Sequence, residues 1–488
     1  MTKRLIIAVV LATVLTSQLS VAAPAKLKRI AVAQREKLSN EWYVEQYGAQ
    51  GDGKSVNTKM IQEAVDKCHE AGGGIVTLRS GIYLSGTIQL KDNVTLQVRR
   101  GAVLRGTLDP MEYYNIDPFV DATGQSRGEC LVGAVDAKNV AIIGNGIIDG
   151  EGEYFKAPLT KKRLEGWGRT AEEVNKYFRV RPFLVRIVRC EGVNIKDINL
   201  RNPGAWTCHL FESRKIKVED ISIVAHVNIN NDGIDLDSCS DVFITGCDID
   251  TGDDAMCIKS TSPKPCENVV ITKCRLKSDW GAIKMGTESM GDYRNIKISN
   301  CEVYDTKGGG IKILTVDGSN IYNVKISQIN MTNVEMPIFV RLGERLRTYR
   351  NAPKGKAGSI DELYFAGIKA TTRSSEESRV ATPSGIFVTG TPNARIGHVS
   401  FQYINITLPG GGTKEDAKRI IPEYETRYPE FSHFGVQPAF GLHARHVERL
   451  DVKGVTFNLL GTDERPVYKY DDVTYYELEF PFLEKQPE

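Results

Sequence analysis

The chain lacks the features that mark membrane or nucleic-acid proteins. After the first 25 residues no stretch approaches the roughly 20 consecutive apolar residues of a spanning helix. The 63 Lys and Arg residues nearly balance 61 Asp and Glu, which gives a net charge of +2 at pH 7. We therefore expect no membrane span and no nucleic-acid partner, and an anionic ligand would have to meet a local basic patch.

The amino terminus is typical of a secretory signal peptide. Lys3 and Arg4 precede an apolar core from Leu5 to Leu15, and small residues follow at Ala22 and Ala23. The pattern predicts a signal peptide over residues 1–23 and export of residues 24–488 to the periplasm or the extracellular medium.

Ten cysteines in an oxidising compartment make disulfides an option. However, Cys247, Cys274 and Cys301 recur at intervals of 27 residues, as does the apolar pattern around them. We favour a stacked interior ladder of small apolar side chains, with disulfides as the alternative.

Helical periodicity is almost absent from the middle of the chain, where β-branched residues alternate with polar ones and Gly, Asn or Asp turns follow. The first β-branched residues of six such segments recur at intervals of 23, 26, 27, 27 and 28 residues: Val193, Ile216, Val242, Val269, Ile296 and Val324. A period in this range indicates a solenoid.

The repeat predicts a parallel β-helix, an all-β fold in which each short strand pairs with its equivalent one turn later. Ile221 and Ile329, each five residues after the start of its segment, fit an interior row together with the cysteines. A two-sheet sandwich is the structural alternative, but it requires no fixed coil length.

Three regions depart from the repeat within a single domain spanning residues 24–488. Residues 26–110 hold the first coils and an amphipathic helix over 58–68, which we expect to cap the open amino-terminal end. Residues 151–182 are charged and helix-prone and form an inserted loop. Residues 351–488 contain less regular coils and a polar, tyrosine-rich tail.

Acidic residues gather in two adjacent coils, in NNDGIDLDSC (230–239) and TGDDAMCIKS (251–260). Asp232 precedes Asp253 and Asp254 by 21 and 22 residues, about one coil, so the three carboxylates are expected to share one groove. Crowded carboxylates repel, so one of them should keep its proton near neutral pH. Such a division into acid and base suits glycoside hydrolysis. Simple Asp and Asn turns and a calcium site are the alternatives.

At these motifs the chain resembles glycoside hydrolase family 28, the polygalacturonases and rhamnogalacturonan hydrolases. NNDGID and the following Asp253 and Asp254 are similar to the family's NTDGID and GDD motifs. YGAQGDGKSVNT and NVAIIGNGIIDGEG also resemble family segments, so the similarity runs from about Trp42 to Leu342. It implies a right-handed parallel β-helix that hydrolyses galacturonosyl bonds with inversion. By this resemblance Asp253 is the general acid, and Asp232 and Asp254 activate water.

The family pattern breaks at two places. Trp280 stands near the position of a family His, and GGGIKILT offers Lys312 and Leu314 where the family has Arg and Lys. The loss of a bidentate Arg weakens uronate binding after the cleaved bond. Either that subsite accepts a neutral sugar such as rhamnose, or other cations hold the carboxylate. We thus expect rhamnogalacturonan oligosaccharides to be cut at least as well as galacturonate oligomers.

The candidate substrate-binding residues combine the acidic motifs, nearby cations and one aromatic ring: Asn230, Lys259, Trp280, Lys284, Lys312 and Arg341, with Arg345 and Arg347 beside the last. Solvated strand faces, ordinary packing or the start of a surface loop are the alternatives for these residues. His226 is a possible substitute for the missing imidazole, although a structural role is favoured.

The sequence thus predicts a pectin-degrading hydrolase that needs no cofactor or metal and acts as a monomer. A β-helix polysaccharide lyase and a non-catalytic glycan-binding solenoid are the alternatives. Unsaturated products would reveal a lyase, and binding without release of reducing ends would reveal a binding protein.

Overall fold

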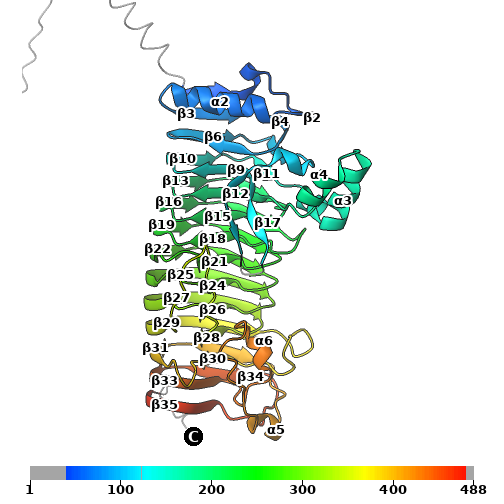
Figure 1. Cartoon of the computed structure of the whole chain (residues 1–488). Coiled ribbons are helices and arrows are strands. Elements are labelled where there is room, and N and C mark those ends of the chain that lie inside the picture. Colours follow the sequence, from blue (N-terminus) through cyan, green and yellow to red (C-terminus); the bar gives the residue numbers. More distant parts are fainter. Residues whose placement is uncertain (1–39, 122–123, 480–488) are drawn as a thin grey trace, which may run out of the picture. The chain divides into compact units, whose positions relative to one another are not determined.

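The structure is a computed structural model that describes residues 40–121 and 124–479. The predicted signal peptide lies outside the described residues. From Glu41 onward the chain forms one compact unit. Almost all of its strand pairs are parallel, and Figure 1 shows the strands stacked coil upon coil from β3 to β35. The antiparallel pair β8–β9 is the exception among the described residues.

The strands fall into three stacks. The first contains the predicted repeat: β1 (Glu41–Tyr43), β3 (Gly74–Leu78), β6 (Val94–Val98), β10 (Lys138–Ile143), β13 (Glu191–Lys196), β16 (Arg214–Glu219), β19 (Ser240–Thr245), β22 (Cys266–Thr272), β25 (Tyr293–Thr306), β27 (Asn320–Val334), β29 (Ser359–Thr372), β31 (Ile396–Gln402), β33 (Leu442–Lys453) and β35 (Tyr468–Glu479).

The long strands of later coils turn a corner and continue into a neighbouring stack. The second stack contains β2 (Asp52–Val56), β4 (Gly81–Ser85), β7 (Ala102–Gly106), β11 (Ile147–Asp149), β14 (Asn199–Arg201), β17 (Ser222–Ala225), β20 (Asp248–Thr251), β23 (Arg275–Ser278), β32 (Asn405–Leu408) and β34 (Thr456–Leu459).

The third stack carries the acidic motifs at the start of its strands. It contains β5 (Ile88–Leu90), β9 (Ser126–Val135), β12 (Phe183–Val188), β15 (Cys208–Phe211), β18 (Ile234–Asp237), β21 (Met256–Ser260), β24 (Ile283–Ser289), β26 (Ile311–Thr315), β28 (Ile338–Leu342) and β30 (Ile386–Thr389), and β8 (Asn115–Val120) pairs with β9.

The register confirms the predicted repeat. Val193 pairs with Ile216, Ile216 with Val242, and the series continues through Val269 and Ile296 to Val324. Parallel pairing in consecutive coils excludes the sandwich. The fold is the expected right-handed parallel β-helix.

The interior rows match the prediction as well. Ile221 and Ile329 are buried in the core, and all ten cysteines are buried and free. Cys247, Cys274 and Cys301 lie one above another, and each thiol donates to the carbonyl two residues before it, at 3.4–3.5 Å. The ladder prediction is confirmed, and the disulfide alternative is not.

One corner of the coil is built by a repeated backbone conformation. The backbone φ lies between 52° and 56° at Asp241, Asn268, Asn295 and Asn323. This is the left-handed region, which Asn and Asp tolerate better than other non-glycine residues. Each Asn amide donates to the side chain in the preceding coil, at 2.9–3.2 Å. This ladder explains why these four segments of the repeat begin with Asn or Asp.

The predicted helices are present. α2 (Thr58–Glu70) buries Ile61, Val65 and Cys68 in the core beside the first coils; its role as a cap stays a prediction. The insertion contains η3 (Gly152–Phe155), α3 (Ala157–Gly166) and α4 (Ala171–Tyr177). The remaining short helices are η1 (Val44–Tyr47), η2 (Pro110–Glu112), α5 (Lys414–Ala417) and α6 (Phe431–Phe434).

The carboxyl-terminal coils are more regular than the sequence period suggested. β29, β31, β33 and β35 remain paired in parallel up to Glu479. The sequence period weakens because long connections, such as residues 409–441, separate strands that still stack. Among the described residues no helix combines the length and apolarity that crossing a membrane requires.

Candidate active site

Asp232 and Asp254 lie next to each other because they precede neighbouring strands in register. Ile234 of β18 pairs with Met256 of β21, and the Gly233 N–H donates to the Asp254 carbonyl at 2.8 Å. Carboxylate oxygens of the two aspartates lie within 4.8 Å of each other, and both residues are only 2% exposed. The two carboxylates therefore form a close, nearly buried pair.

A glycine in the following coil holds Asp254. The Gly281 N–H donates to Oδ1 of Asp254 at 3.1 Å. A Cβ atom at position 281 would come within 2.8 Å of the same oxygen. Glycine thus allows the backbone to approach the carboxylate closely enough to bind it.

Each carboxylate of the pair has its own lysine. Lys259 Nζ lies 3.1 Å from Asp232 and 3.0 Å from Asp235, and Lys284 Nζ lies 2.5 Å from Asp254. Burial alone would lower the pKa of both ammonium groups. The adjacent carboxylates outweigh it and raise the pKa of both lysines well above the ordinary value.

Asp253 differs from its two neighbours because no lysine contacts its carboxyl group among the described residues. Its Oδ1 accepts the N–H of Asp254 at 2.9 Å, and its carbonyl accepts the hydroxyls of Thr251 and Ser278. Burial, followed by the charges of Asp232 and Asp254, raises the pKa of Asp253 to about 8. The side chain is partly exposed, so it can meet a ligand.

The pKa of Asp232 is also raised, chiefly by burial, but Lys259 opposes that effect. Asp235, which the sequence did not single out, is fully buried beside the same lysine, and burial raises its pKa well above the ordinary value. Of the three predicted aspartates, Asp253 is therefore the one placed to hold a proton near neutral pH while still reaching solvent.

Two tryptophans lie near the charged residues of the site. Lys259 Nζ lies 3.8 Å from the ring centroid of Trp206, which is buried and stacks on Phe183. Trp280 is partly exposed, and the Arg379 guanidinium lies 4.2 Å from its ring centroid. Trp206 thus packs beneath the site, whereas Trp280 remains accessible.

Asn230 links the site to two arginines from distant segments. Its Oδ1 accepts from Arg181 at 2.8 Å and from Arg127 at 3.2 Å. Burial lowers the pKa of Arg181 to about 10, with Arg127 acting in the same direction, while Asp232 and Asp253 oppose the shift. Sequence reasoning missed both arginines, because neither belongs to an acidic motif.

Tyr428 also reaches the site, from a segment outside the resemblance. Its hydroxyl accepts from Thr287 at 3.1 Å. Burial raises the pKa of Tyr428, with the charge of Lys284 opposing the shift and that of Asp254 adding to it. No sequence signal marks it, since the connection that carries it has no repeat.

Two predicted substrate-binding cations are not available to a ligand. Lys312 is fully buried, with Nζ 2.6 Å from Glu430. Arg341 is buried and donates to Thr389 and to the carbonyls of Gly390, Glu423 and Tyr424. These interactions already occupy both cations, so the structure does not bring them to the site. Groups of the protein itself bind these two side chains where a substrate carboxylate was expected.

The other candidates are held in other ways. Arg345 is paired with Asp317, and His226 contacts Asp250 at 2.6 Å on an exposed edge, which favours a structural role for His226.

Asp232, Asp254 and Cys257 are close enough to hold a metal ion. However, two ammonium groups already contact the carboxylates, and a thiol is a poor ligand for calcium, which prefers oxygen. The calcium alternative is therefore disfavoured.

These features define a parallel β-helix with a buried pair of carboxylates and a third, raised-pKa carboxyl beside it. The sequence model of glycosyl hydrolases family 28 matches residues 77–413. The chain belongs to glycosyl hydrolases family 28, as the motifs suggested.

Individual relatives agree with this assignment. A probable polygalacturonase of Vitis vinifera is 30% identical over 305 residues, which cover 59% of this chain and 59% of that protein. An exo-poly-alpha-D-galacturonosidase of Dickeya chrysanthemi is 27% identical over 287 residues, covering 50% and 47%. The chain thus spans about half of the length of these relatives.

Among solved structures, the family 28 exopolygalacturonase of Yersinia enterocolitica matches with a TM-score of 0.68 and 18% sequence identity. The match covers 91% of this chain and 79% of that one. At this identity the similarity supports the fold.

Proposed function

We propose that this chain hydrolyses galacturonosyl bonds in pectic polysaccharide, with inversion at the anomeric carbon. The carrying observation is that Asp232 and Asp254 lie within 4.8 Å of each other, each with its own lysine, beside Asp253 without one. Asp253 acts as the general acid, and Asp232 and Asp254 are the pair that activates water. The family and its polygalacturonase relatives support pectin as the substrate.

The proposed step moves two protons, one from Asp253 to the leaving oxygen and one from the attacking water to Asp232 or Asp254. Asp253 protonates the glycosidic oxygen as its bond to the anomeric carbon breaks. A water molecule attacks that carbon from the opposite face and gives its proton to Asp232 or Asp254. Oδ1 of Asp232 is buried without a hydrogen-bond partner, so it is available to accept from this water. Inversion requires roughly 6.5–9.5 Å between the acid and base carboxyls to admit the water.

The lysines of the site do not suit the lyase alternative. A lysine that abstracts a proton must be neutral, which requires a lowered pKa. Ion pairs raise the pKa of both Lys259 and Lys284 instead. These groups are therefore charged partners of Asp232 and Asp254 and do not serve as bases.

The test is the stereochemistry of the first product. Galacturonan digested by the wild-type protein and followed by proton NMR should release new reducing ends first as the β-anomer, since the bond is α-linked. Initial appearance of the α-anomer would contradict inversion. Unsaturated products would establish the lyase, and binding without new reducing ends would establish the glycan-binding solenoid.

We also propose that the protein is exported and acts as a monomer. The pattern of residues 1–23 supports export. Amino-terminal sequencing of the secreted protein should begin near residue 24, and light scattering should give the mass of a single chain.

A further inference from the structure

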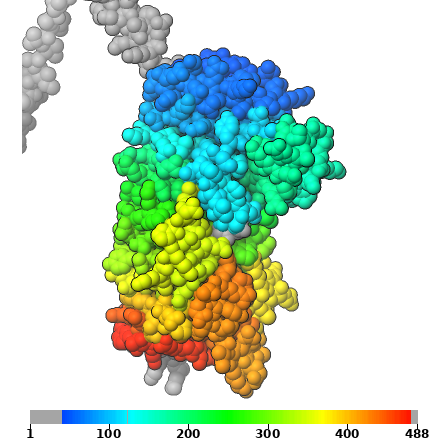
Figure 2. Space-filling view, in the orientation of Figure 1, coloured from blue at the N-terminus to red at the C-terminus, as the bar shows by residue number. Residues whose placement is uncertain are grey.

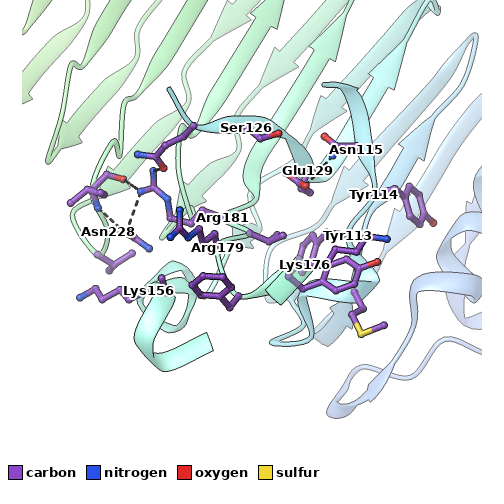
Figure 3. Close-up of a pocket in the computed structure, with 18 of the residues that line it drawn as sticks. Tyr113, Tyr114, Asn115, Ser126, Glu129, Lys156, Lys176, Arg179, Arg181 and Asn228 are labelled. Atoms are coloured by element: carbon purple, nitrogen blue, oxygen red, sulfur yellow. Dashed lines mark hydrogen bonds between the residues drawn. The ribbon is translucent and has the colours of Figure 1, made fainter. Parts of the chain in front are cut away.

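The insertion at residues 151–182 completes a large pocket on the amino-terminal side of the aspartates. The pocket has a volume of about 1380 Å³. This exceeds the roughly 300–1,000 Å³ typical of small-molecule sites, and so fits an oligomer. Its walls come from residues 111–115, the β8–β9 hairpin, the segment around α4 and residues 226–229 (Figure 3). Figure 2 shows the insertion standing out from the coils beside that hairpin.

The lining of this pocket is strongly cationic. Lys156, Lys176, Arg179 and Arg181 line it, against Glu129 as the one acidic residue among the described lining residues. Lys156, Lys176 and Arg179 are exposed, and within residues 40–121 and 124–479 none of them forms an ion pair. A chain with nearly balanced charge has thus collected uncompensated positive charge in one cavity.

Arg181 forms the inner end of the cationic lining. Its side chain is only 8% exposed, and within the part of the chain that the structure describes it donates to the Ile229 carbonyl at 2.7 Å and to the side-chain oxygens of Gln125, Asn228 and Asn230. These bonds use both terminal nitrogens, so Arg181 is a fixed part of the wall that adds positive charge to the inner end of the pocket. Figure 3 shows Arg179 beside it on the segment that leads from α4 into β12.

The pocket is connected to the proposed catalytic centre by one loop. Residues 226–229 line it, and the same loop continues through Asn230, which Arg181 holds, to Asp232. Tyr114, Tyr177 and Phe178 add aromatic surface on which sugar rings can stack. A sugar chain leaving the aspartates towards the amino-terminal coils would enter this cavity.

We propose that this pocket binds two or more consecutive uronate residues of the substrate, whose carboxylates pair with the exposed cations Lys156, Lys176 and Arg179. The inference rests on the proposed function, and it assigns to the insertion the choice of an acidic oligosaccharide on this side of the bond. It also separates the two ends of the site. The cations available to the substrate lie in the pocket, whereas Lys312 and Arg341 on the other side are occupied by protein partners.

The test is calorimetric binding of tetragalacturonate and of its fully methyl-esterified form, in an Asp253→Asn background that prevents turnover. We expect the acid to bind more tightly than the ester. The double substitution Lys176→Gln and Arg179→Gln should weaken binding of the acid about tenfold, the scale of two exposed ion pairs, and leave the ester unchanged. Lys162→Gln, on α3 but outside the lining, is the matched control and should change neither.

Three results would each overturn the proposal that this pocket binds uronates: equal binding of acid and ester, no binding of the acid, or an affinity for the acid that the double substitution leaves unchanged. The result is independent of catalysis. If wild-type protein releases no reducing ends while the acid still binds through Lys176 and Arg179, the proposed hydrolysis fails and the pocket stands. In active protein the double substitution should raise KM for galacturonan and leave kcat nearly unchanged.

Discussion

Lys284 Nζ lies 2.5 Å from Oδ2 of Asp254, and the two residues stand on neighbouring coils. Lys259 and Asp232 repeat this relationship one coil earlier, at 3.1 Å. In both cases the aspartate precedes a strand and the lysine lies on the strand of the next coil. The period of the helix therefore gives Asp232 and Asp254 each a lysine partner, and leaves Asp253 without one.

Removing one of these cations should be costly. Lys284→Met leaves Asp254 buried without a charge partner, so we expect about 3–5 kcal/mol of lost stability and a large loss of turnover. Chemical denaturation and reducing-end release measure the two effects. Lys277→Met, which breaks the half-exposed Lys277–Asp250 pair between the same two coils, is the control and should cost less than about 1 kcal/mol. Equal costs for both variants would contradict the role of the buried pair.

The raised pKa of Asp253 predicts the alkaline limit of activity. The acid must carry its proton, so kcat/KM should fall as pH rises through about 8, because burial and the two neighbouring aspartates raise the pKa of Asp253 to that value. A pH profile of kcat/KM on galacturonan measures this limb. A falling limb near pH 4–5 would show instead that Asp253 is ionised throughout the working range.

The same carboxyl should make stability depend on pH. In the unfolded chain it titrates near its ordinary pKa of about 3.9. In the folded protein it holds its proton up to about pH 8. Because the folded protein binds this proton and the unfolded chain does not, the free energy of unfolding falls as the pH rises between these two values. Asp253→Asn cannot ionise, so its melting temperature should rise relative to wild type between pH 5 and 8, with a gain on the order of 1–3 kcal/mol after solvent screening. A constant difference between the two proteins would contradict this.

Much of the coil was predictable because its determinants are local and periodic. The pairing of Val193, Ile216 and Val242 and the cysteine ladder follow from intervals in the sequence, since each coil repeats the same turn and interior row. The proximity of Asp232 to Asp254 follows from the same period.

What the sequence could not show depends on contacts between distant segments. Lys312 resembles a substrate cation until Glu430, 118 residues later, is seen to occupy it. Arg181, placed by Asn230 49 residues away, belongs to an insertion without a motif. Connections between strands carry no repeat, so their positions over the groove follow from packing alone.

The identity of the sugar after the cleaved bond remains a prediction from the missing cations. Oligosaccharides that share the same galacturonate residues before the bond, and differ only in rhamnose or galacturonate after it, isolate this subsite. We expect the rhamnose form to be cut at least as fast, because Lys312 and Arg341 cannot hold a carboxylate there. A strong preference for galacturonate would point to Arg379, above Trp280, as the cation that replaces them.

The most direct test of the account is the turnover of Asp253→Asn on galacturonan, measured by release of reducing ends from protein shown to be folded by circular dichroism. Asp248→Asn, on the exposed side of the same coil, is the control and should keep wild-type activity. We predict that Asp253→Asn loses at least about a hundredfold in kcat, the scale of general acid catalysis. A folded Asp253→Asn protein that retains most of the wild-type turnover would contradict the assignment of Asp253 as the catalytic acid.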